Sequence, residues 1–166
     1  QLCDQMAQLK QAGKEVILVS SGAVGAGRGL LQLSKTNNEV VQRQVLSAIG
    51  QVHLMELYRQ LLANHGIHCA QVLATKNDFS GRRHYLHMRN CLEGLLAESN
   101  VLPIINEIDV ISISELMFTD NDELASLVAA LLHADGLIIL SSVDGLLDGS
   151  PEDPASQLIK EIPPDD

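Results

Sequence analysis

Four short apolar runs, each followed by polar residues, constrain the fold of this chain more than any other feature. They cover residues 15–21, 68–75, 101–107 and 137–141. Continuous apolar runs of this length are typical of strands that are buried on both faces of a parallel sheet. Because 46% of the residues are hydrophobic and only 2% are aromatic, the core must be aliphatic. The pattern predicts an α/β fold with a mostly parallel central sheet.

Helical spacing of apolar residues fills the segments between these runs. It predicts helices over residues 2–11, 39–64, 82–98 and 121–133. The second helix is long, and its apolar face suits a domain edge or a contact between subunits. This face consists of Val41, Val45, Ile49, Val52, Met55, Tyr58 and Leu62. Gly50 lies inside it, where glycine costs about 1 kcal/mol relative to alanine but lets a neighbouring segment pack closely. We expect the protein to form a homo-oligomer.

Small residues follow the first apolar run, from Ser20 to Gly29. Glycines let the backbone approach a ligand closely, and successive backbone amides can bind an anion. The spacing matches neither the dinucleotide-binding fingerprint nor the P-loop. A flexible turn between a strand and a helix explains this segment, taken alone, equally well.

Acidic and amide side chains follow the third apolar run and recur at the start of the fourth expected helix. Asn106, Glu107 and Asp109 form the first group, and residues 120–123 (Asp-Asn-Asp-Glu) form the second. Either group alone is better explained as an acidic loop or a helix cap, whereas together they suit a polar ligand with a metal. Ligands of open parallel sheets bind at the carboxyl ends of the strands. The pattern therefore predicts a small polar ligand at that edge, which also receives the Ser-Val-Asp-Gly loop at 142–145.

Charge and composition exclude several classes of function. The net charge of -10 argues against a nucleic-acid surface, because phosphate binding needs clustered Lys and Arg. No apolar run approaches the roughly 18 residues that a membrane span needs. Cys3, Cys69 and Cys91 have no CxxC spacing, so we interpret them as reduced thiols in a cytosolic protein. His84 and His87 lack a third ligand nearby, and we predict no metal site made by the protein.

Four motifs together resemble the amino-acid kinase family, over essentially the whole chain. They lie at residues 19–24 (Val-Ser-Ser-Gly-Ala-Val), 103–109 (Pro-Ile-Ile-Asn-Glu-Ile-Asp), 120–122 (Asp-Asn-Asp) and 143–146 (Val-Asp-Gly-Leu). The pairing of the second motif with the third resembles the branch of the family that phosphorylates L-glutamate. The resemblance implies a three-layer sandwich with a mostly parallel central sheet, present here as a truncated core.

The implied reaction is transfer of the γ-phosphoryl group of ATP to the side-chain carboxylate of L-glutamate. It gives L-glutamyl 5-phosphate and is the first step of proline biosynthesis. The resemblance further implies ATP and Mg²⁺ as cofactors, proline as a feedback inhibitor and a cytoplasmic enzyme. Phosphoryl transfer depends mainly on positioning and charge neutralisation rather than on covalent chemistry by the protein.

Residue roles follow from the same resemblance. It implies that Ser21 and Gly22 hold the substrate and the transferring phosphate, and that Asp109 and Asn121 hold the amino-acid part of glutamate. In this interpretation the carboxylate of Asp109 pairs with the ammonium group of the substrate. The residue before Asp109 is Ile108, where Asn is usual in this branch.

The resemblance assigns a catalytic role to Asp122, which would orient the catalytic lysines. It places Ser141 and Ser142 at the nucleotide, although Asp is usual at the position of Ser142. The first strand of the family and its glycine-rich nucleotide loop, each with a catalytic lysine, have no matching motif here. We therefore expect residues 1–166 to be the central portion of an amino-acid kinase domain, inactive when taken alone.

Two other functions remain open at this point. One is a non-catalytic glutamate-binding or regulatory module derived from such a kinase, which the unmatched lysines favour. The other is a related kinase that acts on acetylglutamate, aspartate or a nucleotide. The pairing of motifs 103–109 and 120–122 makes the second less compatible with the sequence.

Overall fold

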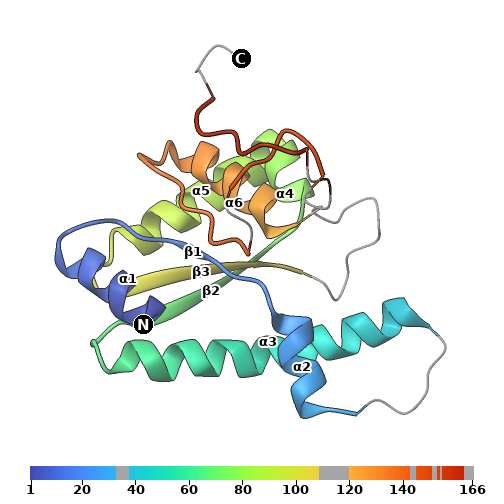
Figure 1. Ribbon diagram of the computed structural model, residues 1–166. Coiled ribbons are helices and arrows are strands. Elements are labelled where there is room, and N and C mark those ends of the chain that lie inside the picture. Colours follow the sequence, from blue (N-terminus) through green and yellow to red (C-terminus); the bar gives the residue numbers. More distant parts are fainter. Residues whose placement is uncertain (33–37, 109–119, 143–144, 151–152, 154, 163–166) are drawn as a thin grey trace. The chain divides into compact units, whose positions relative to one another are not determined.

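The computed structural model describes residues 1–32, 38–108, 120–142, 145–150, 153 and 155–162 (Figure 1). The chain divides into two compact units, Gln1–Asp135 and Gly136–Asp166, and each is described by itself. The helices and strands assigned in the described residues all belong to the first unit. In chain order they are α1 (Leu2–Gln11), β1 (Leu18–Val19), α2 (Ala23–Leu30), α3 (Glu39–Ala63), β2 (His68–Ala74), α4 (Asn77–Ser80), α5 (Arg82–Leu96), β3 (Val101–Glu107) and α6 (Asn121–Leu132).

The sheet of the first unit is parallel, as the apolar runs predict. Its strand order in the described residues is β1-β3-β2, with Val19 opposite Ile105 and Val72 opposite the same residue on the other side. Every residue of β3 from Leu102 to Glu107 is buried, because this strand has a neighbour on each edge and helices on each face. The first apolar run, whose continuous apolar character predicts a central strand, instead forms β1, which lies at one side of the described sheet and pairs over only two residues.

Helices cover both faces of this sheet (Figure 1). Neighbouring residues of a strand point to opposite faces, so Ile104 and Ile105 contribute to different cores. One core joins α1 and α3 to the sheet, and its buried residues are Cys3, Met6, Ala7, Leu62, Ile67, Leu102 and Ile104. The other joins α5 and α6 to it, with Val72, Ala74, Leu92, Ile105, Leu124, Val128 and Leu131. The first unit thus has the predicted three layers, with an aliphatic core.

The glycine-rich segment differs from the predicted turn. Only its first residues form a turn, and Ala23 to Leu30 form the helix α2, which contains Gly25, Gly27 and Gly29. Glycine is a poor helix former, but here close packing outweighs that preference. A Cβ atom on Gly27 would collide with the backbone of Leu46 in α3, and one on Gly50 would collide with the backbone of Ala23 in α2. The expectation that Gly50 admits a close neighbour is confirmed.

In the second half of α3 the predicted apolar face is confirmed, because Leu62 is buried and Met55 and Tyr58 pack against the same core. In the first half the buried face is not the apolar face that the sequence suggests. Val41, Val45, Ile49 and Val52 are each at least 37% exposed. The buried positions of its first half are instead Leu46, Ser47, Gly50 and Gln51. Contact with α2 selects small residues on this side of the helix, and apolar periodicity cannot reveal that preference. The proposed subunit contact through α3 stays a prediction.

The fourth apolar run is not a strand, which corrects the sequence-based expectation. Residues 137–141 are described, and none of them belongs to a strand. The second unit instead has an isolated antiparallel bridge between Leu147 and Leu158. A strand requires a neighbour whose backbone groups complete its hydrogen bonds, and an apolar run does not show whether such a neighbour is present. Among the described residues, no helix is both long enough and apolar enough to cross a membrane.

Candidate active site

The turn after β1 is fixed at its first residue. The backbone N–H of Ser20 donates to the carbonyl oxygen of Ile105 over 2.9 Å, which extends the pairing of β1 with β3. The hydroxyl of Ser20, a residue only 6% exposed, lies 2.8 Å from the hydroxyl of Tyr58 in α3. The turn is therefore held both by the sheet and by the long helix.

Ser21 and Gly22, two of the predicted substrate-binding residues, are exposed just beyond this anchor. Gly22 has φ of 101°, a left-handed conformation that side chains rarely adopt, and it is the N-cap residue of α2. Since glycine has no side chain to cap the helix, the backbone amides of the first turn of α2 have no side-chain cap within the described residues. A helix N-terminus of this kind favours carboxylate or phosphate groups.

The end of β3 is fixed by a buried amide pair. Asn106 Nδ2 donates to Gln51 Oε1 over 2.9 Å, and the backbone N–H of Glu107 donates to Asn106 Oδ1 over 2.9 Å. The N–H of Ile108 then donates to the carbonyl oxygen of Ala74 in β2. Because β1 and β3 are parallel, their carboxyl ends lie side by side, and this end of β3 is at the same carboxyl edge of the sheet as Ser20. Asp109 lies outside the described residues, so its predicted contact with the substrate stays a prediction.

The acidic start of α6 contains one helix-capping residue and two side chains that have no partner within the described residues. Asp120 is the N-cap: its Oδ1 accepts from the N–H of Glu123 over 2.9 Å. The half-buried Asn121 and the exposed Asp122 have no side-chain hydrogen bond or ion pair within the described residues. They are therefore free to bind a ligand. Asp120 instead caps the helix, as the alternative interpretation of this motif predicted.

An ion pair locates the start of α6 relative to the sheet. Lys76 Nζ lies 3.0 Å from Glu123 Oε1, and Lys76 follows the end of β2 by two residues. Leu124 and Val128 pack with Ile105 of β3 in the same core. The first turn of α6 thus lies at the carboxyl edge, together with the ends of β1 and β3.

A pocket of about 200 Å³ opens beside the end of β3. Its lining comes from α3, β2 and β3, and consists of Ser47, Ala48, Gln51, Val52, Gln71, Leu73, Glu107 and Ile108. Glu107, from the first predicted acidic group, is among them, whereas Ser21, Gly22, Asn121 and Asp122 are not. Gly50-Gln51 falls in the order expected for the family, but the resemblance gave Gln51 no role in the site. The available signal was a polar pair, Ser47 and Gln51, at helical spacing on one face of α3.

The remaining predictions concern the nucleotide and the metal. Ser141 and Ser142 belong to the second unit, so their predicted proximity to the nucleotide stays a prediction. In the described part of the chain, no three His, Cys, Asp or Glu side chains gather as a metal site would require. Mg²⁺ commonly uses only one or two carboxylates together with substrate phosphates, which is compatible with the lone, unpartnered Asp122.

Comparison with known proteins gives a consistent result. The model of the amino acid kinase family matches residues 1–166. The chain is 53% identical, over 97% of its length, to a glutamate 5-kinase of Bacteroides thetaiotaomicron, and 52% identical, over 98%, to one of Chlorobaculum tepidum. It is 46% identical, over 99% of its length, to glutamate 5-kinase 2 of Bacillus subtilis. The chain covers 44%, 44% and 45% of these relatives, respectively, which is less than half of their length.

Proposed function

We propose, since this chain belongs to the amino acid kinase family, that its protein transfers the γ-phosphoryl group of ATP to the side-chain carboxylate of L-glutamate. The products would be L-glutamyl 5-phosphate and ADP, so the protein would be a transferase of proline biosynthesis. The observation that carries the proposal is the carboxyl edge of the sheet. The turn at Ser20–Gly22, the end of β3 and the first turn of α6 meet there. The names of the relatives favour this kinase over a non-catalytic module or a kinase for another substrate.

In this proposal the substrate is held by the turn after β1 and by the two polar motifs. Ser21 and the amides that follow Gly22 would bind the reacting carboxylate and the transferring phosphate, because a helix N-terminus stabilises negative charge. Asp109 would pair with the substrate ammonium. Asn121, whose amide has no partner within the described residues, would bind the α-carboxylate or the ammonium of the same substrate.

Catalysis would depend on charge neutralisation around the transferring group. Asp122 would orient the catalytic lysines, and Ser141 and Ser142 would contact the nucleotide. Mg²⁺ would supply positive charge to the phosphates of ATP, and Asp122, whose carboxylate has no partner within the described residues, would be a residue to hold it. We further propose that the protein is cytoplasmic, forms a homo-oligomer and is inhibited by proline.

The direct test is an assay of the full-length protein with ATP, Mg²⁺ and L-glutamate. ADP release should depend on glutamate, and hydroxylamine should trap the acyl phosphate as the γ-hydroxamate. Aspartate and acetylglutamate should give little product. Glutamate binding without ADP release would instead identify a non-catalytic module.

Two substitutions at opposite ends of α6 test the role of Asp122. Asp122→Asn should lower kcat by about 10²-fold, the loss typical of one preorganised electrostatic group. Asp135→Asn, which changes an exposed carboxylate beyond the other end of α6, should leave kcat unchanged. Equal kcat values for the two variants would contradict the assignment of Asp122.

The role of Asp109 is tested by calorimetry. Asp109→Ala should weaken glutamate binding by about 2–5 kcal/mol, because the ammonium group would lose its counter-ion in a partly desolvated site. ATP binding should not change. Unchanged glutamate affinity in this variant would rule out the proposed ion pair.

A further inference from the structure

We propose that Gln51 is a positioning residue of the glutamate site, which holds the amide of Asn106 in one orientation and so sets the end of β3. This inference rests on the proposed function. Gln51 would act through Asn106 and the backbone of Glu107, without touching the substrate itself.

Both ends of the Asn106 amide are engaged in the structure. Its Nδ2 donates to Gln51 Oε1, and its Oδ1 accepts from the backbone N–H of Glu107, each over 2.9 Å. Asn106 is 3% exposed and Gln51 is 9% exposed, so water is largely excluded from the pair. A rotation of the amide by half a turn would place Nδ2 against the N–H of Glu107, two donors facing each other. The backbone N–H of Glu107 therefore selects this orientation of Asn106, and the acceptor oxygen of Gln51 holds it by satisfying the Nδ2 donor.

The position of Gln51 in the fold explains why its hydrogen bond to Asn106 matters for the site. Gln51 and Asn106 are 55 residues apart in sequence, on α3 and β3, so the bond ties the long helix to the central strand. Asp109 follows Glu107 by two residues. The effect of Gln51 on glutamate is therefore expected through the end of β3, the segment that leads in sequence to the residue proposed to pair with the substrate ammonium.

The same turn of α3 also supports the other half of the proposed site. Gly50, next to Gln51, contacts the backbone of Ala23 in the first turn of α2, directly after Gly22. Helix α3 thus contacts the segment after β1 and the last residues of β3. The spacing between the ends of β1 and β3 is set by this helix as well as by the sheet.

Loss of the acceptor at residue 51 should affect glutamate and spare ATP. Gln51→Met keeps the length of the side chain but removes the acceptor, and Gln51→Asn shortens the reach by one methylene group. Each should raise KM for glutamate about tenfold, because a buried amide donor is left unsatisfied or must reorient. Gln51→Glu keeps an acceptor oxygen at the same reach and should stay within about threefold of the wild-type KM. KM for ATP should not change in any of the three variants.

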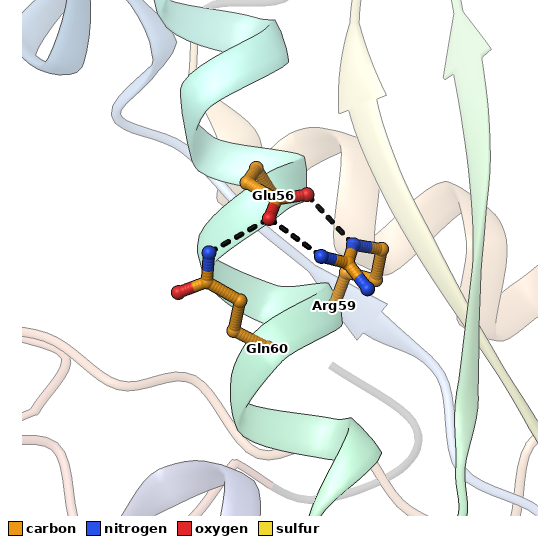
Figure 2. A network of polar contacts seen from close by, with 3 residues as sticks. All are labelled: Glu56, Arg59 and Gln60. Atoms are coloured by element: carbon orange, nitrogen blue, oxygen red, sulfur yellow. Dashed lines mark hydrogen bonds and ion pairs between the residues drawn. The ribbon is translucent and has the colours of Figure 1, made fainter.

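The matched control is Gln60→Met, on the same helix. Figure 2 shows that the Gln60 side chain donates to Glu56, which also binds Arg59, on the exposed side of α3. This variant loses a glutamine hydrogen bond without contacting Asn106, and its KM for glutamate should match that of the wild type. Thermal unfolding of all variants shows whether a kinetic change merely follows a loss of stability.

The outcomes separate the two proposals. An active wild-type protein whose Gln51→Met and Gln51→Asn variants keep the wild-type KM for glutamate would overturn this inference alone. Equal losses in KM for glutamate, KM for ATP and kcat would also overturn it, since they would indicate general damage. If Gln51→Met fails to fold, the milder Gln51→Asn variant decides. A wild-type protein that does not phosphorylate glutamate would overturn the proposed function, and this inference with it.

Discussion

Gly27 of α2 and Gly50 of α3 lie so close that a Cβ atom on Gly50 would be 2.5 Å from the backbone nitrogen of Gly27. Real Cβ atoms do not approach backbone atoms this closely, so the two helices meet backbone to backbone. α2 begins directly after the proposed substrate turn. The contact between these glycines therefore determines where that turn can lie relative to α3.

Gly50→Ala should destabilise the protein although alanine is the better helix former. The added methyl group would collide with the backbone of Ala23, and overpacking of this kind costs about 1–3 kcal/mol. Gly94→Ala, in the interior of α5, is the matched control because a Cβ there meets nothing within 4 Å. It should stabilise the protein by about 0.5–1 kcal/mol. Urea unfolding measures both, and a Gly50→Ala variant as stable as Gly94→Ala would contradict the close contact.

Much of the fold of the first unit follows from the sequence. Apolar runs at 68–75 and 101–107 and the helical spacing at 2–11, 39–64, 82–98 and 121–133 correspond closely to β2, β3, α1, α3, α5 and α6. Burial of aliphatic residues dominates these elements, and periodicity reports burial directly. The parallel sheet follows from the same pattern.

What the sequence could not predict depends on partners distant in the chain. α2 is stable as a helix because Gly27 and Gly50 allow it to contact α3, and neither glycine predicts that alone. Residues 137–141 are apolar enough for a strand but form none. In the candidate site, the resemblance gave roles to Asn121 and Asp122, whereas a role for Gln51 follows only from its bond to Asn106.

The network in Figure 2 makes a prediction about pH. Arg59 and Gln60 donate hydrogen bonds to Glu56 and lower the pKa of its carboxyl group from 4.5 to about 2. A lowered pKa means that the network contributes stability above pH 4.5, which is lost as the pH falls toward 2. A carbon-detected NMR titration should give Glu56 a midpoint well below 4.5. A midpoint near 4.5 would mean that the network does not persist in solution.

Tyr58→Phe should loosen the turn after β1. The substitution leaves the hydroxyl of the buried Ser20 with only a 3.3 Å contact to the carbonyl oxygen of Ser21. Loss of one such hydrogen bond costs about 0.5–1.5 kcal/mol. Tyr85→Phe is the control, because the Tyr85 ring packs against the other core and its hydroxyl has no hydrogen bond within the described residues. Amide hydrogen exchange should rise at the start of α2 in Tyr58→Phe and stay unchanged in Tyr85→Phe.

The two aspartates at the start of α6 should respond differently to substitution, because only one of them caps the helix. Asp120 accepts a hydrogen bond from the N–H of Glu123, and replacing such a cap by alanine costs about 1 kcal/mol. Asp120→Asn should retain most of the stability, since asparagine caps equally well. Asp122 is exposed and has no side-chain partner within the described residues, so Asp122→Ala should lose only its interaction with the helix dipole, about 0.3–1 kcal/mol. Urea unfolding of Asp120→Ala, Asp120→Asn and Asp122→Ala measures these losses of stability. An Asp122→Ala variant less stable than Asp120→Ala would show that Asp122 supports the fold, and would weaken its assignment to phosphoryl transfer.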